Sequence, residues 1–219
     1  TPHTALTVSV LSEVVTNRAP GQLSLGMDLP WEQVRDRVRA GEDAELREML
    51  QFTLDSPLVR QMAPTLHAYA SASFLPGRGV LDSTLDLMGR IHRDFAYDPT
   101  ATTTSTPLTQ VWDQRRGVCQ DFAHLAIGMV RAIGLPAGYV SGYLETLPPP
   151  GQVKLVGADA SHAWFAIHVP ETGWVEFDPT NDQMPTEQYV VIARGRDYSD
   201  VPPLKGVIYG GGSHAVQVS

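Results

Sequence analysis

The segment that most constrains the fold is an apolar run that follows Gly117-Val118-Cys119. From Cys119 to Ile133, large apolar side chains recur at helical spacing, and small or apolar residues also fill the remaining faces. A helix that is apolar all round must be buried on every side. Gly134 and Pro136 predict its end, because glycine terminates helices and proline cannot continue them. We therefore predict a central buried helix that begins at a cysteine.

The order of the remaining elements predicts the fold class. Two helical pieces divided near Gly41 are expected over residues 31–52. A helix over residues 57–70 should be kinked at Pro64 or divided there into two segments. A further helix should start from the cap Asp82-Ser83 and run to Tyr97, and a short one should cover residues 108–114. Alternating and apolar runs predict strands at residues 4–15, 137–145, 162–169, 174–178, 189–193, 207–209 and 215–218. Helices first and strands later is the α+β order.

We divide the 219-residue chain into three parts. Residues 1–20 hold the isolated first strand, residues 21–80 form a helical lead-in, and residues 81–219 form the core. An isolated strand presents an unpaired edge, which predicts a homodimer formed through the N-terminal strand.

Composition excludes two classes of partner. The chain is 42% hydrophobic and 18% charged, and its longest apolar stretch, residues 122–140, is interrupted by His124, Arg131 and Pro136. We therefore expect no membrane span. The 16 basic and 24 acidic residues give a net charge of −8, and no basic run is longer than Arg115-Arg116. This balance argues against a nucleic-acid surface.

Cys119 is the one cysteine of the chain. A single thiol excludes an intramolecular disulfide and a cysteine-based zinc site, and it favours a reducing, cytoplasmic location. Asp121, Asp159 and Asp182 do not have the spacing of a calcium loop, so we expect neither a metal nor a cofactor.

The position of Cys119 also suggests chemistry. A thiol at a helix start lies near unpaired backbone N–H groups and the positive end of the helix dipole, which favour the thiolate. His124 lies about 140° round the helix and points elsewhere. His162 instead begins an apolar strand, and Asp178 ends the next one. With a turn near Pro170, both side chains fall at one end of a hairpin, as a base and its orienting carboxylate require.

Each of these residues also has an ordinary structural interpretation. Cys119 suits a small buried hydrophobe, His162 a strand-end histidine, and Asp178 a turn-former before Pro179. Together, a thiol at a helix start and a His and an Asp on paired strands match nucleophilic thiol catalysis.

The motifs around these residues resemble the bacterial transglutaminase-like proteins. The similarity is carried by Arg116-Gly117-Val118-Cys119-Gln120-Asp121-Phe122, Gly134-Leu135-Pro136-Ala137, Ser161-His162-Ala163-Trp164 and Gly173-Trp174-Val175-Glu176-Phe177-Asp178-Pro179-Thr180-Asn181. The resemblance implies a papain-like fold, with the cysteine helix packed on an antiparallel sheet that bears His and Asp. It implies that Cys119 is the nucleophile, His162 the general base and acid, and Asp178 its orienter. It also implies that residues 4–15 are the remnant of an N-terminal β-rich domain.

Several functions share this pattern. We expect a cysteine peptidase, amidase or protein-glutamine acyltransferase that acts on a peptide or protein amide through a thioester, with hydrolysis favoured over cross-linking. The alternative is a non-catalytic binding or scaffold module on the same fold. Acyl transfer to arylamines is disfavoured because Arg116-Gly117 replaces the paired glycines of that family, and peptide-glycanase activity because its zinc-binding cysteines are absent from the sequence.

Overall fold

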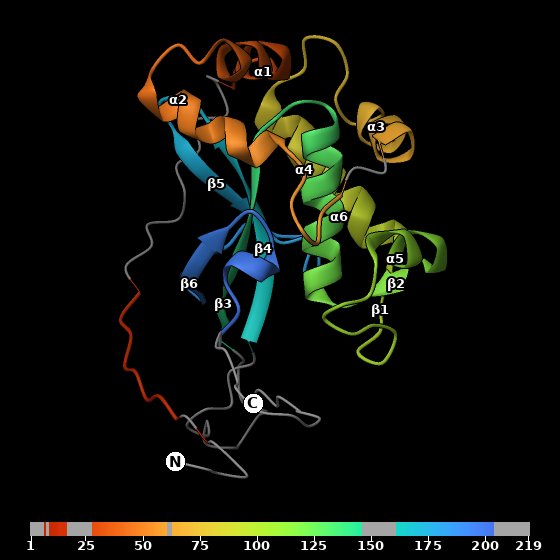
Figure 1. Cartoon of the computed structure of the whole chain (residues 1–219), viewed down its shortest axis with the longest axis vertical. Coiled ribbons are helices and arrows are strands. Elements are labelled where there is room, and N and C mark those ends of the chain that lie inside the picture. Colours follow the sequence, from red (N-terminus) through yellow and green to blue (C-terminus); the bar gives the residue numbers. More distant parts are fainter. Residues whose placement is uncertain (1–6, 8, 17–27, 61–62, 146–160, 204–219) are drawn as a thin grey trace, which may run out of the picture.

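A computed structural model describes residues 7, 9–16, 28–60, 63–145 and 161–203. Helices lie on one side of a sheet and also cover one of its ends (Figure 1). The helices are α1 (Trp31–Ala40), α2 (Ala44–Met49), η2 (Leu50–Thr53), α3 (Ala63–Ser71), α4 (Val80–Asp94), α5 (Leu108–Gln114), α6 (Cys119–Ala132) and η3 (Tyr198–Asp200). The strands are β1 (Ala96–Tyr97), β2 (Arg116–Gly117), β3 (Ala137–Leu144), β4 (Ser161–Val169), β5 (Gly173–Phe177) and β6 (Tyr189–Gly195).

Four strands form an antiparallel sheet in the order β5-β4-β3-β6. Side chains alternate across it, as the two-residue period of a strand requires. On β4, the odd-numbered residues from Ala163 to Val169 join the main core, whereas Trp164 and Ala166 belong to a separate cluster on the opposite face. Both faces of the sheet therefore carry buried apolar side chains.

Helix α6 packs on the first of these faces and is buried almost throughout, as predicted. Val34 of α1, Val59 of the segment before α3, and Leu66 of α3 share its core. On the second face, residues of α1, α2 and η2 pack with Trp174 near the β4–β5 hairpin. Helices α1 and α2 lie at this end of the sheet (Figure 1). The fold is therefore the predicted α+β arrangement of a central helix on an antiparallel sheet.

Two helices begin elsewhere than predicted. Helix α4 starts at Val80 rather than at the cap Asp82-Ser83, because the carboxylate of the distant Asp28 accepts hydrogen bonds from the backbone N–H groups of Leu81 and Asp82 at 3.0 Å each. Helix α3 starts at Ala63, so Pro64 lies in its first turn and produces no kink.

Outside the four-stranded sheet, the strands predicted from the sequence and the strands in the structure differ. Of the strand predicted at residues 4–15, residues 4–6 and 8 lie outside the described residues. Residues 9–16 form no strand, and Val10, Leu11 and Val15 are exposed, because no strand in the described part of the chain pairs with them. The strands predicted at residues 207–209 and 215–218 lie outside the described residues. Two short strands were not predicted: β1 pairs with β2 in parallel and brings Tyr97 beside Gly117.

Arg131 joins the two layers near the end of α6. It is 2% exposed, and its guanidinium donates to the carbonyls of Leu54, Ala137 and Arg196 and to the hydroxyl of Ser56. All of its N–H groups face an acceptor, so the buried charge is compensated. Within the described part of the chain, no helix has the length and apolar character to cross a bilayer.

Candidate active site

Cys119 is the first residue of α6 and is half-buried. The carboxylate of Asp121 accepts hydrogen bonds from the Val118 backbone N–H at 2.8 Å and from the Thr102 hydroxyl at 2.5 Å. A Cβ at Gly117 would lie 2.6 Å from this carboxylate, so only glycine leaves the junction undisturbed. Asp121 therefore ties the loop to the helix and fixes where Cys119 lies.

His162 and Asp178 come from neighbouring strands. The β4–β5 register pairs Phe165 with Phe177, which sets Asp178 across from Trp164 on the face that also carries His162. His162 Nε2 lies 2.7 Å from Asp178 Oδ2. The hairpin geometry predicted from the sequence, with His and Asp within reach at one end, is therefore confirmed.

The thiol of Cys119 lies close enough to the His162 imidazole to act on its pKa. Burial lowers the pKa of His162, but hydrogen bonds to Asp178 and Cys119, with their charges, outweigh burial and raise this pKa to about 9. The Cys119–His162–Asp178 contact thus joins helix α6 to two strands of the sheet. A proton can pass between the thiol and the imidazole, while the carboxylate orients the ring and stabilises its protonated form.

Asp178 is fully buried and has further donors. Its Oδ2 also accepts from the side chains of Asn181 at 2.6 Å and Tyr189 at 2.7 Å, and its Oδ1 accepts from the backbone N–H of Thr180 at 2.9 Å. Burial raises the pKa of Asp178, but the hydrogen bonds from His162, Asn181 and Tyr189 and the His162 charge lower it below its ordinary value. The carboxylate is therefore ionised at neutral pH.

His124, Trp112 and Trp164 have structural roles. His124 does not face Cys119: its Nε2 accepts from the Tyr198 backbone N–H at 3.2 Å. Trp112 packs against Tyr69 and lies under the Arg115 guanidinium. Trp164 is fully buried and packs in the cluster on the second face of the sheet.

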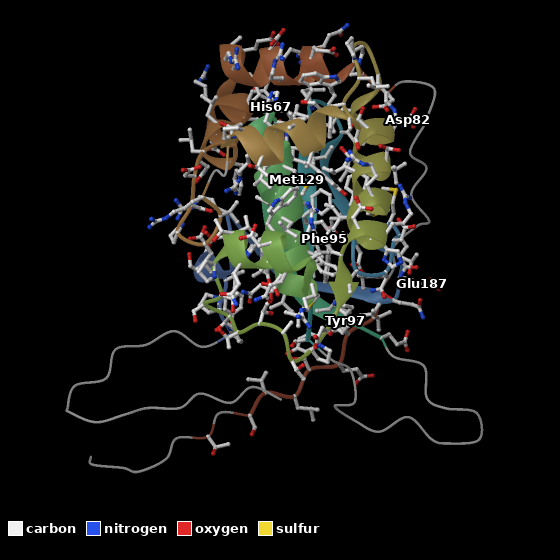
Figure 2. The ribbon with its side chains drawn as sticks, turned by 90° about the vertical axis from the view of Figure 1, so that its right-hand side faces the viewer. His67, Asp82, Phe95, Tyr97, Met129 and Glu187 are labelled. Atoms are coloured by element: carbon white, nitrogen blue, oxygen red, sulfur yellow. The ribbon has the colours of Figure 1, made fainter. Side chains whose placement is uncertain are left out.

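Sequence reasoning missed residues that the fold brings to the site. Tyr189 and Gln183 belong to no motif that marks them, whereas Asn181 lies within the segment after Asp178 and could have been found there. Tyr97 reaches the site through the β1–β2 pairing, is 56% exposed, and lies at the end of the molecule where α6 begins (Figure 2). Burial, followed by the charge of Cys119, raises the pKa of Tyr97.

A pocket of about 430 Å³ lies away from Cys119. Arg35, Arg39 and Gly134 are among the residues that line it, so it sits at the C-terminal end of α6, about 20 Å from Cys119 along the helix. It does not contribute to the site at Cys119. Among the described residues, no group of three or more His, Cys, Asp and Glu side chains is arranged to hold a metal ion.

Comparison with known proteins identifies the family. Residues 76–179, which include Cys119, His162 and Asp178, match the model of the transglutaminase-like superfamily. An uncharacterized protein of Mycobacterium tuberculosis is 43% identical over 98% of this chain and 68% of its own length. The chain belongs to the transglutaminase-like superfamily.

Other relatives of this transglutaminase-like chain carry descriptive names. A protein-glutamine gamma-glutamyltransferase of Pseudomonas aeruginosa is 32% identical over 57% of this chain, which spans 20% of that enzyme. A crystal structure from Cytophaga hutchinsonii, described provisionally as a cysteine protease, aligns with a TM-score of 0.58 and 30% identity over 71% of this chain and 49% of that protein. The chain thus spans about half of that protein and a smaller share of the glutamyltransferase.

Proposed function

We propose that this chain cleaves or transfers the acyl group of a peptide, isopeptide or carboxamide bond through a thioester on Cys119. The observation that carries the proposal is the His162 imidazole, which lies 2.7 Å from the buried carboxylate of Asp178 and close enough to the Cys119 thiol for the thiol to raise its pKa. It supplies the nucleophile, a base, and the group that orients the base. The names of the glutamyltransferase and of the cysteine protease described above support the same class of chemistry.

In the first half of this mechanism, His162 takes the proton of Cys119, and the thiolate attacks the amide carbonyl carbon. A C–S bond forms and the carbonyl oxygen becomes an oxyanion. The backbone N–H groups of Cys119 and Gln120 lie in the first turn of α6, where a helix provides them no acceptor, so they are suited to stabilise this charge. The C–N bond then breaks, and the His162 imidazolium protonates the leaving amine.

In the second half, His162 takes a proton from the acceptor, which attacks the thioester carbon and releases the Cys119 thiolate. Asp178 holds His162 by Nε2, which leaves the other ring nitrogen for the thiol. We propose water as the acceptor, in preference to an amine that would give cross-linking, and a peptide or protein amide as the substrate.

The first experiment measures iodoacetamide alkylation of Cys119 by intact mass, from pH 5.5 to 9.5. In the wild type we expect fast alkylation below pH 7, because the neighbouring imidazolium stabilises the thiolate. In His162→Ala that reaction should disappear and alkylation should be confined to alkaline pH. Equal profiles in the two proteins would make Cys119 a structural residue and support the scaffold interpretation.

A second experiment identifies the reaction. Glutamine-containing peptides are incubated with and without a primary amine, and ammonia release and product masses are followed, with Cys119→Ala as the control. Deamidated or cleaved peptide is expected in both conditions. Product that forms only with the amine present would show transamidation instead, and no product above the Cys119→Ala control would contradict the proposed activity on these amides.

A further inference from the structure

Three side-chain donors share one oxygen of Asp178. His162, Tyr189 and Asn181 lie 2.7, 2.7 and 2.6 Å from Oδ2. A carboxylate oxygen offers about two lone-pair sites. The three donors therefore divide the negative charge of Oδ2 among them, and the share that reaches His162 depends on the other two.

The hydroxyl of Tyr189 has a defined orientation. Gln183 donates its side-chain N–H to the Tyr189 oxygen at 2.6 Å, which leaves the hydroxyl hydrogen free to point at Asp178, 2.7 Å away. Tyr189 is 2% exposed, and burial is the main cause that raises its pKa. The hydroxyl therefore remains a donor across the working pH range.

These groups are held in place by a closed loop. The backbones of Asp178 and Gln183 are bonded in both directions, at 2.9 and 3.3 Å. On the outside, the His92 ring contacts the carbonyl oxygens of Pro179 and Thr180 at 3.3 and 3.0 Å, which attaches the loop to α4. Asp178, Asn181 and Gln183 thus come from one six-residue segment, and Tyr189 from the start of the adjacent strand β6.

We propose that Tyr189 is a positioning residue whose hydroxyl, oriented by Gln183, competes with His162 for Asp178 Oδ2 and so limits the charge that Asp178 presents to the imidazole. The inference rests on the proposed function, in which His162 is the base. The hydroxyl of Tyr189 is a dipole whose hydrogen points toward the Asp178 carboxylate. That hydrogen opposes the attraction between Asp178 and a protonated His162.

The proposal predicts the direction in which the His162 titration moves when Tyr189 loses its hydroxyl. The groups that act on His162 are Cys119 from α6, Asp178 just after β5 and, through Asp178, Tyr189 from β6. Two uncharged groups also face the imidazole: the Asn181 amide nitrogen, 3.4 Å from Nε2, and the Trp164 ring, 5.8 Å away. When the Tyr189 hydroxyl is removed, more of the Oδ2 charge acts on His162. The imidazolium is then stabilised, and His162 should titrate at higher pH.

The test is a nuclear magnetic resonance titration of ¹⁵N-histidine in the full chain, with His162 assigned by His162→Gln. We expect Tyr189→Phe to raise the His162 midpoint by roughly half a pH unit, and Gln183→Leu to raise it by less. Tyr143→Phe is the matched control: Tyr143 lies on the neighbouring strand β3, is 43% exposed, and should leave the midpoint unchanged. An unchanged or lowered midpoint in Tyr189→Phe overturns the proposal.

Two further measurements keep the test decisive. If Tyr189→Phe does not give a folded spectrum, the Gln183→Leu titration decides in its place, and a midpoint equal to that of the wild type overturns the proposal. Where a substrate is turned over, the alkaline limb of kcat/KM should move upward with the midpoint, which loss of structure alone would not cause. If no substrate is turned over, the proposed function fails, but the titration still tests the role of Tyr189.

Discussion

His124 should make this protein sensitive to acid, although it takes no part in the proposed chemistry. The ring is 4% exposed on α6, and its Nε2 accepts the backbone N–H of Tyr198 at 3.2 Å. Protonation would place two N–H groups face to face inside the core. Burial is the largest cause, and with the opposing effect of Asp197 it leaves the pKa of His124 at about 4, below the ordinary 6.5.

The sign of the effect follows from linkage. The pKa of His124 is lower in the folded chain than in the unfolded chain. The contribution of the neutral ring to the free energy of unfolding is therefore fully present above pH 6.5 and is lost as the pH falls toward 4. The whole pKa shift of His124 corresponds to about 3 kcal/mol in the free energy of unfolding. Of this, about 2 kcal/mol is lost between pH 7 and pH 5.

The assay is urea denaturation of the wild type and of His124→Gln at both pH values. Glutamine can place an oxygen near the position of Nε2 and accept the Tyr198 N–H, but it does not titrate. The wild type should lose about 2 kcal/mol more than the variant between pH 7 and pH 5, because other titrating groups contribute equally to both. Equal losses in the two proteins would refute the reasoning.

Three further substitutions test how the site is supported. In Gly117→Ala the new Cβ displaces the Asp121 carboxylate, which should destabilise the chain by about 1–3 kcal/mol in urea denaturation. The same displacement should slow alkylation of Cys119, and an unchanged alkylation rate would contradict this explanation. Asp28→Ala should lower the free energy of unfolding by about 1 kcal/mol, because it removes the cap of α4. Asp82→Ala, at the cap predicted from the sequence, should change it by less than about 0.5 kcal/mol. The reverse ranking in the same assay would show that the local cap dominates. Arg131→Met should cost more than about 3 kcal/mol by thermal or urea denaturation, because it leaves buried carbonyls without donors, and a near-neutral result would refute that role.

Much of the scaffold could be predicted from local patterns. Helix α5 has the predicted bounds, and the helix from Cys119, the four sheet strands and the hairpin that brings His162 to Asp178 follow closely from hydrophobic period and turn residues. These features depend on interactions between residues close in sequence. For the same reason, the sequence placed the cap of α4 at a nearby Asp82, since Asp28 lies more than 50 residues away along the chain.

The sequence by itself determined which side chains could do chemistry: a single thiol at the start of a buried helix, and a His and an Asp at one end of a hairpin. Only the tertiary structure decided what surrounds them. The β1–β2 pairing brings Tyr97 toward Cys119, and β6 brings Tyr189 to Asp178, since strand pairing joins residues that no local period relates. The charge balance of His162 is set by these long-range contacts, because electrostatic interactions depend on distance in space and on burial, not on separation along the chain.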